Sequence, residues 1–194
     1  MAGTGAAIAS ENHQLYYEDE QIELNQDLWV VDGWTYVPVR EFAERVGWPL
    51  AYDGESGRVT LTNAIGDELV FQPGTAKIAY NGHDYEMSGT VKVKEGNAYF
   101  PLRLLAEAMH ASVDWLKSEN RAVIQTEQEY VVERGDSLES IAQTHEISVE
   151  TLQLRNGLTG WELDVGQRLK VVIPEFMDPQ RQAAAKDAEA EDAI

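Results

Sequence analysis

The residues that could do chemistry in this chain are carboxylates and a few histidines. The 194 residues include 34 Asp and Glu, four His and no Cys. The absence of cysteine excludes thiol nucleophiles, disulfides and Cys-ligated metals. His13, His83, His110 and His145 do not have the spacing of a metal-binding motif. The sequence contains neither HExxH nor Gly-x-Ser-x-Gly. Counting alone leaves open a carboxylate pair for glycoside hydrolysis.

The overall charge limits the class of partner. The formal net charge is −19 at pH 7, and such a surface repels phosphate backbones, so nucleic acid is not expected as a partner. The same repulsion disfavours anionic membranes and anionic wall polymers, and favours a neutral or cationic ligand. No apolar run is long enough to cross a bilayer, so no transmembrane segment is predicted.

The chain begins MAGTGAAIAS, and Ala7-Ile8-Ala9 has the form of a signal-peptidase site. A full signal peptide also needs a basic start and a longer apolar stretch. Residues 1–13 are therefore interpreted as a flexible start or as the remnant of a secretion signal. The alternative is an Ala/Gly-rich terminus without functional meaning.

A second feature is an internal repeat. Residues 15–62 align without a gap on residues 78–125, an offset of 63 residues. The identities include Tyr36/Tyr99, Pro38/Pro101, Arg40/Arg103, Ala43/Ala106 and Glu44/Glu107. Because units this short bury their apolar surface jointly, the sequence predicts one domain over residues 14–127, called the repeat region below.

Each unit has the pattern of two strands, a helix and two more strands. Pro38 and Pro101 stand where the helices begin, a position that tolerates a missing N–H. Gly47 suits the residue after the first helix, and His110 replaces it in the second unit. The fold class is therefore α+β, with small antiparallel sheets and a helix in each of two duplicated units.

Some side chains of the repeat region allow two readings. Arg40 and Arg103 lie four residues before Glu44 and Glu107. They are interpreted as helix-surface ion pairs or as contacts to loop carbonyls, and a duplicated ligand clamp is the alternative. Among the aromatic residues, Tyr52 and Trp115 match in the repeat and are expected in the core. Trp34 and Trp48 have no aromatic counterpart and are expected to be more exposed.

The terminal module, residues 128–174, is predicted to fold as strand, helix, helix, strand. Asp136 and Glu139 suit the N-cap and N3 positions of the first helix, and Ser148 suits the N-cap of the second. Asn156-Gly157 ends that helix. The outer strands are expected at 129–133 and near 166–172.

The repeat units carry Y-V-P-V-R-E-F-A-E-R-V-G-W (36–48) and Y-F-P-L-R-L-L-A-E-A-M (99–109). These segments resemble the copper amine oxidase N-terminal-like "stalk" domains that are common in secreted Gram-positive proteins. The resemblance implies a spacer or a protein-interaction platform outside any catalytic domain. Copper in the parent enzymes needs three histidines and a modified tyrosine. The scattered histidines of this chain lead us to expect neither copper nor another cofactor, and no enzyme activity.

The terminal module reads YVVERGDSLESIAQTHEISVETLQLRNGL…LDVGQRLKVV, which resembles a LysM domain. That resemblance implies binding of N-acetylglucosamine-containing glycans, either peptidoglycan or chitin, and association with the cell wall outside the cell. One residue departs from the family pattern, because Arg155 stands where a large apolar residue usually precedes the Asn. Packing near Arg155, and with it glycan affinity, is expected to differ.

Carried over by position, the resemblance places the glycan groove between two loops. The first loop contributes Gly135, Asp136, Ser137 and Leu138. The second contributes Asn156, Gly157, Leu158, Thr159, Gly160, Trp161 and Leu163, with Glu162 between the last two. Backbone groups of these glycine-containing loops suit an acetamide, and Leu158 and Leu163 suit its methyl group. Trp161 is interpreted either as a stacking platform or as a partly buried anchor. Asp136 and Asn156 have structural readings, as a helix cap and as a loop brace.

After Pro174 the sequence turns acidic and rich in Ala over residues 175–194, which predicts a solvated helix or disorder. Three functions remain open. The first is a secreted, non-catalytic cell-wall-binding protein. The second is a peptidoglycan hydrolase, or its targeting or accessory part. The third is a structural protein that oligomerises through the repeat region.

Overall fold

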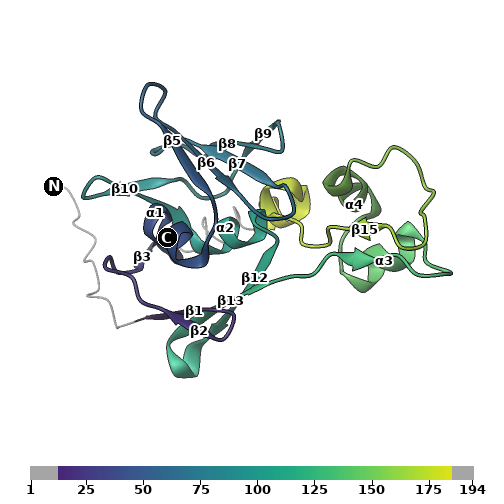
Figure 1. Cartoon of the computed structure of the whole chain (residues 1–194), viewed down its shortest axis with the longest axis horizontal. Coiled ribbons are helices and arrows are strands. Elements are labelled where there is room, and N and C mark those ends of the chain that lie inside the picture. Colours follow the sequence, from purple (N-terminus) through teal and green to yellow (C-terminus); the bar gives the residue numbers. More distant parts are fainter. Residues whose placement is uncertain (1–12, 185–194) are drawn as a thin grey trace.

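The computed structural model describes residues 13–184. Figure 1 shows the repeat region as a group of sheets around two short helices, with the terminal module at one end. The residues expected to be a flexible start, apart from residue 13, lie outside the described part, as do residues 185–194.

The two units of the repeat region have the same order of elements. The first contains β1 (Gln14–Tyr17), β2 (Glu20–Ile22), β3 (Trp29–Val31), β4 (Trp34–Pro38), α1 (Val39–Val46), β5 (Leu50–Asp53) and β6 (Arg58–Thr62). The second contains β8 (Lys77–Tyr80), β9 (His83–Glu86), β10 (Lys92–Lys94), β11 (Asn97–Pro101), α2 (Leu102–Ala108), β12 (Ala111–Leu116), the 3-10 turn η1 (Lys117–Glu119) and β13 (Arg121–Thr126). Strand β7 (Glu68–Phe71) lies between the units. Most elements of the second unit begin 63 residues after their counterparts, as the sequence offset predicts.

The sheets interleave the two units. The central sheet has the order β10-β11-β4-β3, and β4 pairs with its counterpart β11 in an antiparallel register. One outer sheet, β12-β13-β1-β2, joins the last hairpin of the second unit to the first hairpin of the first. The other, β5-β6-β7-β8-β9, joins the remaining two hairpins through β7. Neither unit completes an outer sheet by itself.

The helices begin and end where the sequence predicts. Pro38 and Pro101 are the residues before α1 and α2, and both keep an extended ψ. Gly47 ends α1 in the left-handed region with φ 74°. His110 takes the matching place after α2 with φ 61°, a conformation that costs a non-glycine residue energy. Contacts of its ring with the terminal module, described below, hold it there.

The expected exposure of two aromatic residues was wrong. Trp48 is only 9% exposed, because the chain turns back after Gly47 and packs its ring against Tyr17 and Phe42. Tyr52 is 55% exposed, because it lies on the edge strand β5. Trp34 and Trp115 are both partly buried against the core of the repeat region.

The terminal module contains β14 (Tyr130–Val131), α3 (Leu138–Thr144), α4 (Val149–Asn156) and β15 (Arg168–Leu169). Its small core consists of Val132, Leu138, Ile141, Ala142, Leu152 and Leu169. The N-cap of α3 is one residue later than predicted: Ser137 accepts from Ser140 N–H, and Ser140 returns a bond to Ser137 N–H. The Asp136 carboxylate instead accepts hydrogen bonds from the Tyr130 hydroxyl and the Glu133 N–H. Ser148 caps α4 as predicted.

The segment after Pro174 matches the predicted solvated helix only over 179–184, which are mostly exposed. It forms the buried 3-10 turn η2 (Glu175–Met177), followed by a helical stretch over 179–184. Phe176 packs on the rings of Tyr80 and Tyr85, with centroids 5.2 and 5.4 Å away. In the first unit Trp48 packs on Tyr17, the counterpart of Tyr80, but the second unit has Ala111 in the place of Trp48. The C-terminal segment therefore supplies the aromatic ring that the second unit lacks.

Candidate functional site

The first loop of the predicted groove is built by a turn at Gly135, which has φ 99°. Asp136 accepts hydrogen bonds from Glu133 N–H at 2.8 Å and from the Tyr130 hydroxyl at 2.7 Å. These two bonds stabilise the carboxylate and lower the pKa of Asp136. Ser137 is used as the cap of α3, and the Leu138 side chain is fully buried in the module core. Exposed backbone at Gly135 is thus the part of this loop most open to a ligand.

The second loop begins where α4 ends. Asn156 donates to the carbonyls of Leu152 and Lys170 and accepts from Lys170 N–H at 2.7 Å. These bonds make Asn156 a brace between α4 and the strand that follows the loop. Gly157 takes the left-handed conformation, with φ 63°, that turns the chain out of α4.

The outer part of the second loop is open to solvent. Thr159, Gly160 and Trp161 are exposed, and Trp161 is 63% exposed. Gln153 holds the loop by donating to the Gly160 carbonyl at 2.9 Å. The exposure of Trp161 does not fit a partly buried anchor.

The two loops meet over one core. Leu158 and Leu163 are partly buried and pack on the same cluster that contains Leu138. Backbone bonds between Val132 and residues 166–167 connect the end of the second loop to the strand before the first. Two of the predicted glycan-contacting residues, Leu158 and Leu163, are thus connected to the first loop through the module core, whereas Leu138 is buried within that core.

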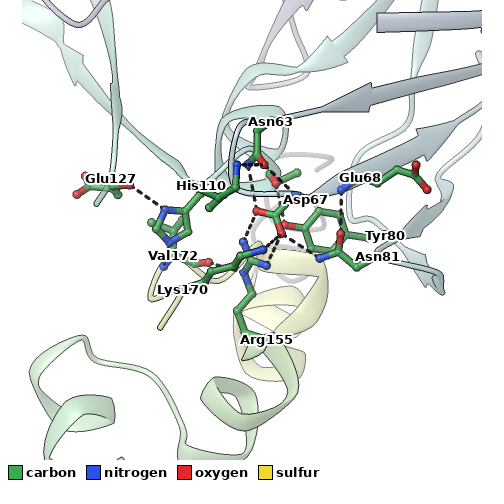
Figure 2. A network of polar contacts seen from close by, with 12 residues as sticks. Asn63, Asp67, Glu68, Tyr80, Asn81, His110, Glu127, Arg155, Lys170 and Val172 are labelled. Atoms are coloured by element: carbon green, nitrogen blue, oxygen red, sulfur yellow. Dashed lines mark hydrogen bonds and ion pairs between the residues drawn. The ribbon is translucent and has the colours of Figure 1, made fainter. Parts of the chain in front are cut away.

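Behind this surface the module is fastened to the repeat region by a buried ion pair. Arg155 places Nη1 and Nη2 each 2.8 Å from the two carboxylate oxygens of Asp67. Both side chains have no solvent exposure. Lys170 adds a third contact, with Nζ 2.7 Å from Asp67. Figure 2 shows the carboxylate surrounded by Arg155, Lys170 and the side-chain amides of Asn63 and Asn81.

Asp67 is fully satisfied, as a buried charge must be. Asn63 and Asn81 donate to it at 3.1 and 3.0 Å. Burial alone would raise the pKa of Asp67, but the Arg155 guanidinium and these donors hold it well below its usual range. Burial alone would lower the pKa of Arg155, but the bond and the charge of Asp67, together with Tyr80 and Tyr85, raise it above its usual value. Both groups are therefore charged at every physiological pH.

His110 makes a second connection between the two parts. Its Nδ1–H donates to the Glu127 carbonyl at 2.9 Å, and its Nε2 accepts from the N–H groups of Val171 and Val172 at 3.1 and 3.3 Å. A ring that donates at one nitrogen and accepts at the other is a neutral imidazole. Burial lowers the pKa of His110, in keeping with this state.

The prediction of a helix-surface ion pair between Arg103 and Glu107 in the second unit was wrong. Glu107 instead accepts from Glu175 N–H at 2.9 Å and from Arg181 Nη2 at 2.6 Å. Arg181 also donates to the Ile173 carbonyl. In the first unit Arg40 lies over the exposed Tyr52 ring, 6.0 Å from its centroid. These contacts do not form a matched pair of clamps.

The described residues do not fit a copper centre. Over residues 13–184 no group of three or more His, Cys, Asp or Glu side chains could hold a metal ion. His110 uses both ring nitrogens in the interface, and His13 is bonded to Asn120. None of the helices in the described range is long and apolar enough to span a membrane.

Comparison with protein families gives two matches. Residues 16–150 match the family described as "Copper amine oxidase N-terminal domain". The chain belongs to this family. Residues 130–172 match the LysM domain, so the copper amine oxidase N-terminal domain is followed by LysM. The two matches overlap over 130–150, which hold β14, α3 and the start of the LysM helix α4. A search of curated proteins finds no significant match.

The LysM match implies peptidoglycan binding and cell-wall association. The unusual Arg155 of this LysM domain is explained by its partner in the copper amine oxidase N-terminal domain. Sequence reasoning noticed Arg155 but did not find Asp67, which lies between the two repeat units and has no counterpart in the repeat. It also noticed His110 only as a replacement for glycine.

Proposed function

We propose that the chain is a non-catalytic, extracellular protein that binds the N-acetylglucosamine-containing glycan of peptidoglycan through its LysM surface. The observation that carries this proposal is the exposure of Gly135, Thr159, Gly160 and Trp161 in two loops of the module, with Leu158 and Leu163 partly buried in the second loop. A ligand site of this kind combines apolar contact area with a few polar groups that fix orientation.

Each part of an N-acetylated sugar has a partner on this surface. Exposed backbone at the glycine turns suits the acetamide N–H and carbonyl. The partly buried leucines suit its methyl group, and the Trp161 ring suits the apolar face of a pyranose. The net charge of −19 is compatible with an uncharged glycan and unfavourable for a polyanion.

The repeat region acts in this proposal as a rigid spacer for LysM and as a platform for protein contact, and its two units are copies of one ancestral unit. The buried Asp67–Arg155 pair and the His110 contacts support a fixed relation between the two parts. A cleft of about 630 Å³ beside α1, lined in part by the exposed Tyr52 and Val93, supports the platform role.

Titration of the intact chain with N-acetylglucosamine oligomers, together with a pull-down on purified peptidoglycan, tests this function. Gly160→Asp is the disabling variant, because it adds a charge and a side chain at an exposed turn. Leu154→Ala is the matched control, since Leu154 is an exposed apolar residue of the same module, on α4. Saturable binding that Gly160→Asp abolishes and Leu154→Ala retains is expected.

Absence of binding to both ligands would overturn the proposal. The non-catalytic part is tested separately by incubating the chain with purified walls and assaying released muropeptides. No release is expected. Release that is lost on replacement of a single carboxylate would identify a hydrolase instead.

A further inference from the structure

One carboxylate of the repeat region holds both ends of the second groove loop. Arg155 is the last residue before the Asn156 brace, and Lys170 follows β15, where the loop has returned. Both bond Asp67, at 2.8 and 2.7 Å. Figure 2 shows the two side chains converging on it from the module side. Asp67 thus bonds a residue on each side of the loop that carries Trp161.

Neighbouring contacts reinforce these two bonds. Asn156 bonds both the N–H and the carbonyl of Lys170, so the two ends of the loop are also tied to each other. Arg155 Nε donates to the Val172 carbonyl at 3.0 Å. His110 accepts from the N–H groups of Val171 and Val172, directly beyond Lys170. Between these ties, residues 159–162 are exposed, and the Gln153 side chain donates to the Gly160 carbonyl. Residues 166 and 167 also pair with the Val132 backbone.

We propose that Asp67 is a positioning residue for glycan binding: by clamping Arg155 and Lys170 it fixes the ends of the second groove loop and so pre-forms the binding surface. This inference rests on the proposed function. It makes the repeat region part of the binding machinery, although none of its residues touches the glycan.

The physical reason is loop entropy. A loop whose ends are fixed samples fewer conformations, so less freedom is lost when a ligand orders it. Without Asp67 the buried Arg155 charge would have no counter-charge, and the guanidinium would move toward water. That movement would carry the end of α4 and the Asn156 brace with it. Glycan affinity would then fall because the groove must be ordered on binding.

The test uses the full chain and two variants. Asp67→Asn keeps the shape of the side chain and removes the charge. The double variant Asp67→Leu with Arg155→Leu replaces the ion pair by apolar packing, a change that buried pairs often tolerate without loss of stability. Glu68→Gln is the control, because Glu68 is an exposed neighbour of Asp67. Three quantities are measured: the Kd for N-acetylglucosamine oligomers, the melting temperature, and amide hydrogen exchange.

Both variants are expected to bind the oligomers roughly 3- to 10-fold more weakly, because the ligand must then order a loop that is already ordered in the wild type. Amide exchange should rise over residues 157–167 and stay unchanged in α3. The double variant should keep the melting temperature of the wild type, which separates positioning from simple destabilisation. Glu68→Gln should match the wild type in all three measurements.

Wild-type affinity in the double variant, with unchanged exchange over 157–167, would overturn the positioning role and leave the proposed function standing. A wild-type chain that binds no oligomer would instead overturn the proposed function. In that case the exchange data still decide whether Asp67 holds the loop.

Discussion

Val37 and Phe100 face each other across the antiparallel pair β4–β11, and each is the counterpart of the other, 63 residues away. The flanking pairs, Tyr36 with Pro101 and Pro38 with Tyr99, exchange places under the same offset. The centre of the repeat region therefore coincides with a local twofold relation between the units. Both side chains at this centre are completely buried.

Phe100→Ala should destabilise the protein by about 3–5 kcal/mol, because it empties a fully enclosed position shared by both units. Denaturant titration followed by tryptophan fluorescence measures the change. Val93→Ala, on the exposed β10, should alter stability by less than about 0.5 kcal/mol. Similar losses in the two variants would contradict a core centred on β4 and β11.

Phe176→Ala should cost a comparable amount, about 3–5 kcal/mol, although Phe176 lies beyond the terminal module. Its ring packs on Tyr80 and Tyr85 and is buried in the core of the repeat region. Thermal unfolding checks this value, with the exposed Gln180→Ala as the control. A Phe176→Ala protein as stable as the wild type would mean that the C-terminal segment is dispensable.

Stability should fall as the pH drops below about 6.5, the ordinary pKa of histidine. Burial in the folded protein lowers the pKa of His110 and keeps its ring neutral. The unfolded chain therefore binds this proton first, and the slope is at most about 1.4 kcal/mol per pH unit. Arg155 acts in the same direction as burial, whereas Glu127, Asp67 and Glu129 oppose it.

Urea unfolding at a series of pH values measures this dependence. His110→Asn, chosen because Asn tolerates a left-handed backbone, should be less stable and should lose the slope between pH 6.5 and 5. His83→Gln, on the exposed end of β9, should keep it. A second decline below about pH 4 is expected from Asp67, whose folded pKa is lowered below that of the unfolded chain. An unchanged slope in His110→Asn would remove His110 as its source.

Trp161→Ala should weaken binding of N-acetylglucosamine oligomers about 10-fold or more, as truncation of a central aromatic contact does. The melting temperature should not change, because Trp161 is 63% exposed and outside the module core. Calorimetric titration gives the affinity. Equal affinity in Trp161→Ala would show that the ring does not stack on the sugar.

Local signals in the sequence predicted much of the fold. The prolines before α1 and α2 and the glycine that ends α1 are confirmed, and most elements of the two units follow the 63-residue offset. The left-handed backbone at His110 was not predicted. The cap of α3 was misplaced by one residue, because Asp136 and Ser137 are both able to cap and the choice depends on the Tyr130 bond.

What the sequence did not predict depends on partners far along the chain. Arg155 stood out as an exception to the LysM pattern, but its partner lies 88 residues earlier in a segment with no repeat signal. Phe176 is buried against Tyr80 and Tyr85, which lie far earlier in the chain. The acidic, Ala-rich composition of the C-terminal segment predicts exposure, and it does not identify the few residues, such as Phe176, that are buried.

The interleaving of hairpins has a consequence for the history and handling of this fold. Each outer sheet needs strands from both units, so a polypeptide with a single unit would have unpaired strand edges on both hairpins. Two such polypeptides could satisfy one another by exchanging hairpins, as in a domain-swapped dimer. The repeat region is in this sense a dimer whose halves are joined by residues 63–76, which also supply β7 to one outer sheet. A cut between β6 and β7 or between β7 and β8 should yield halves that are soluble only together.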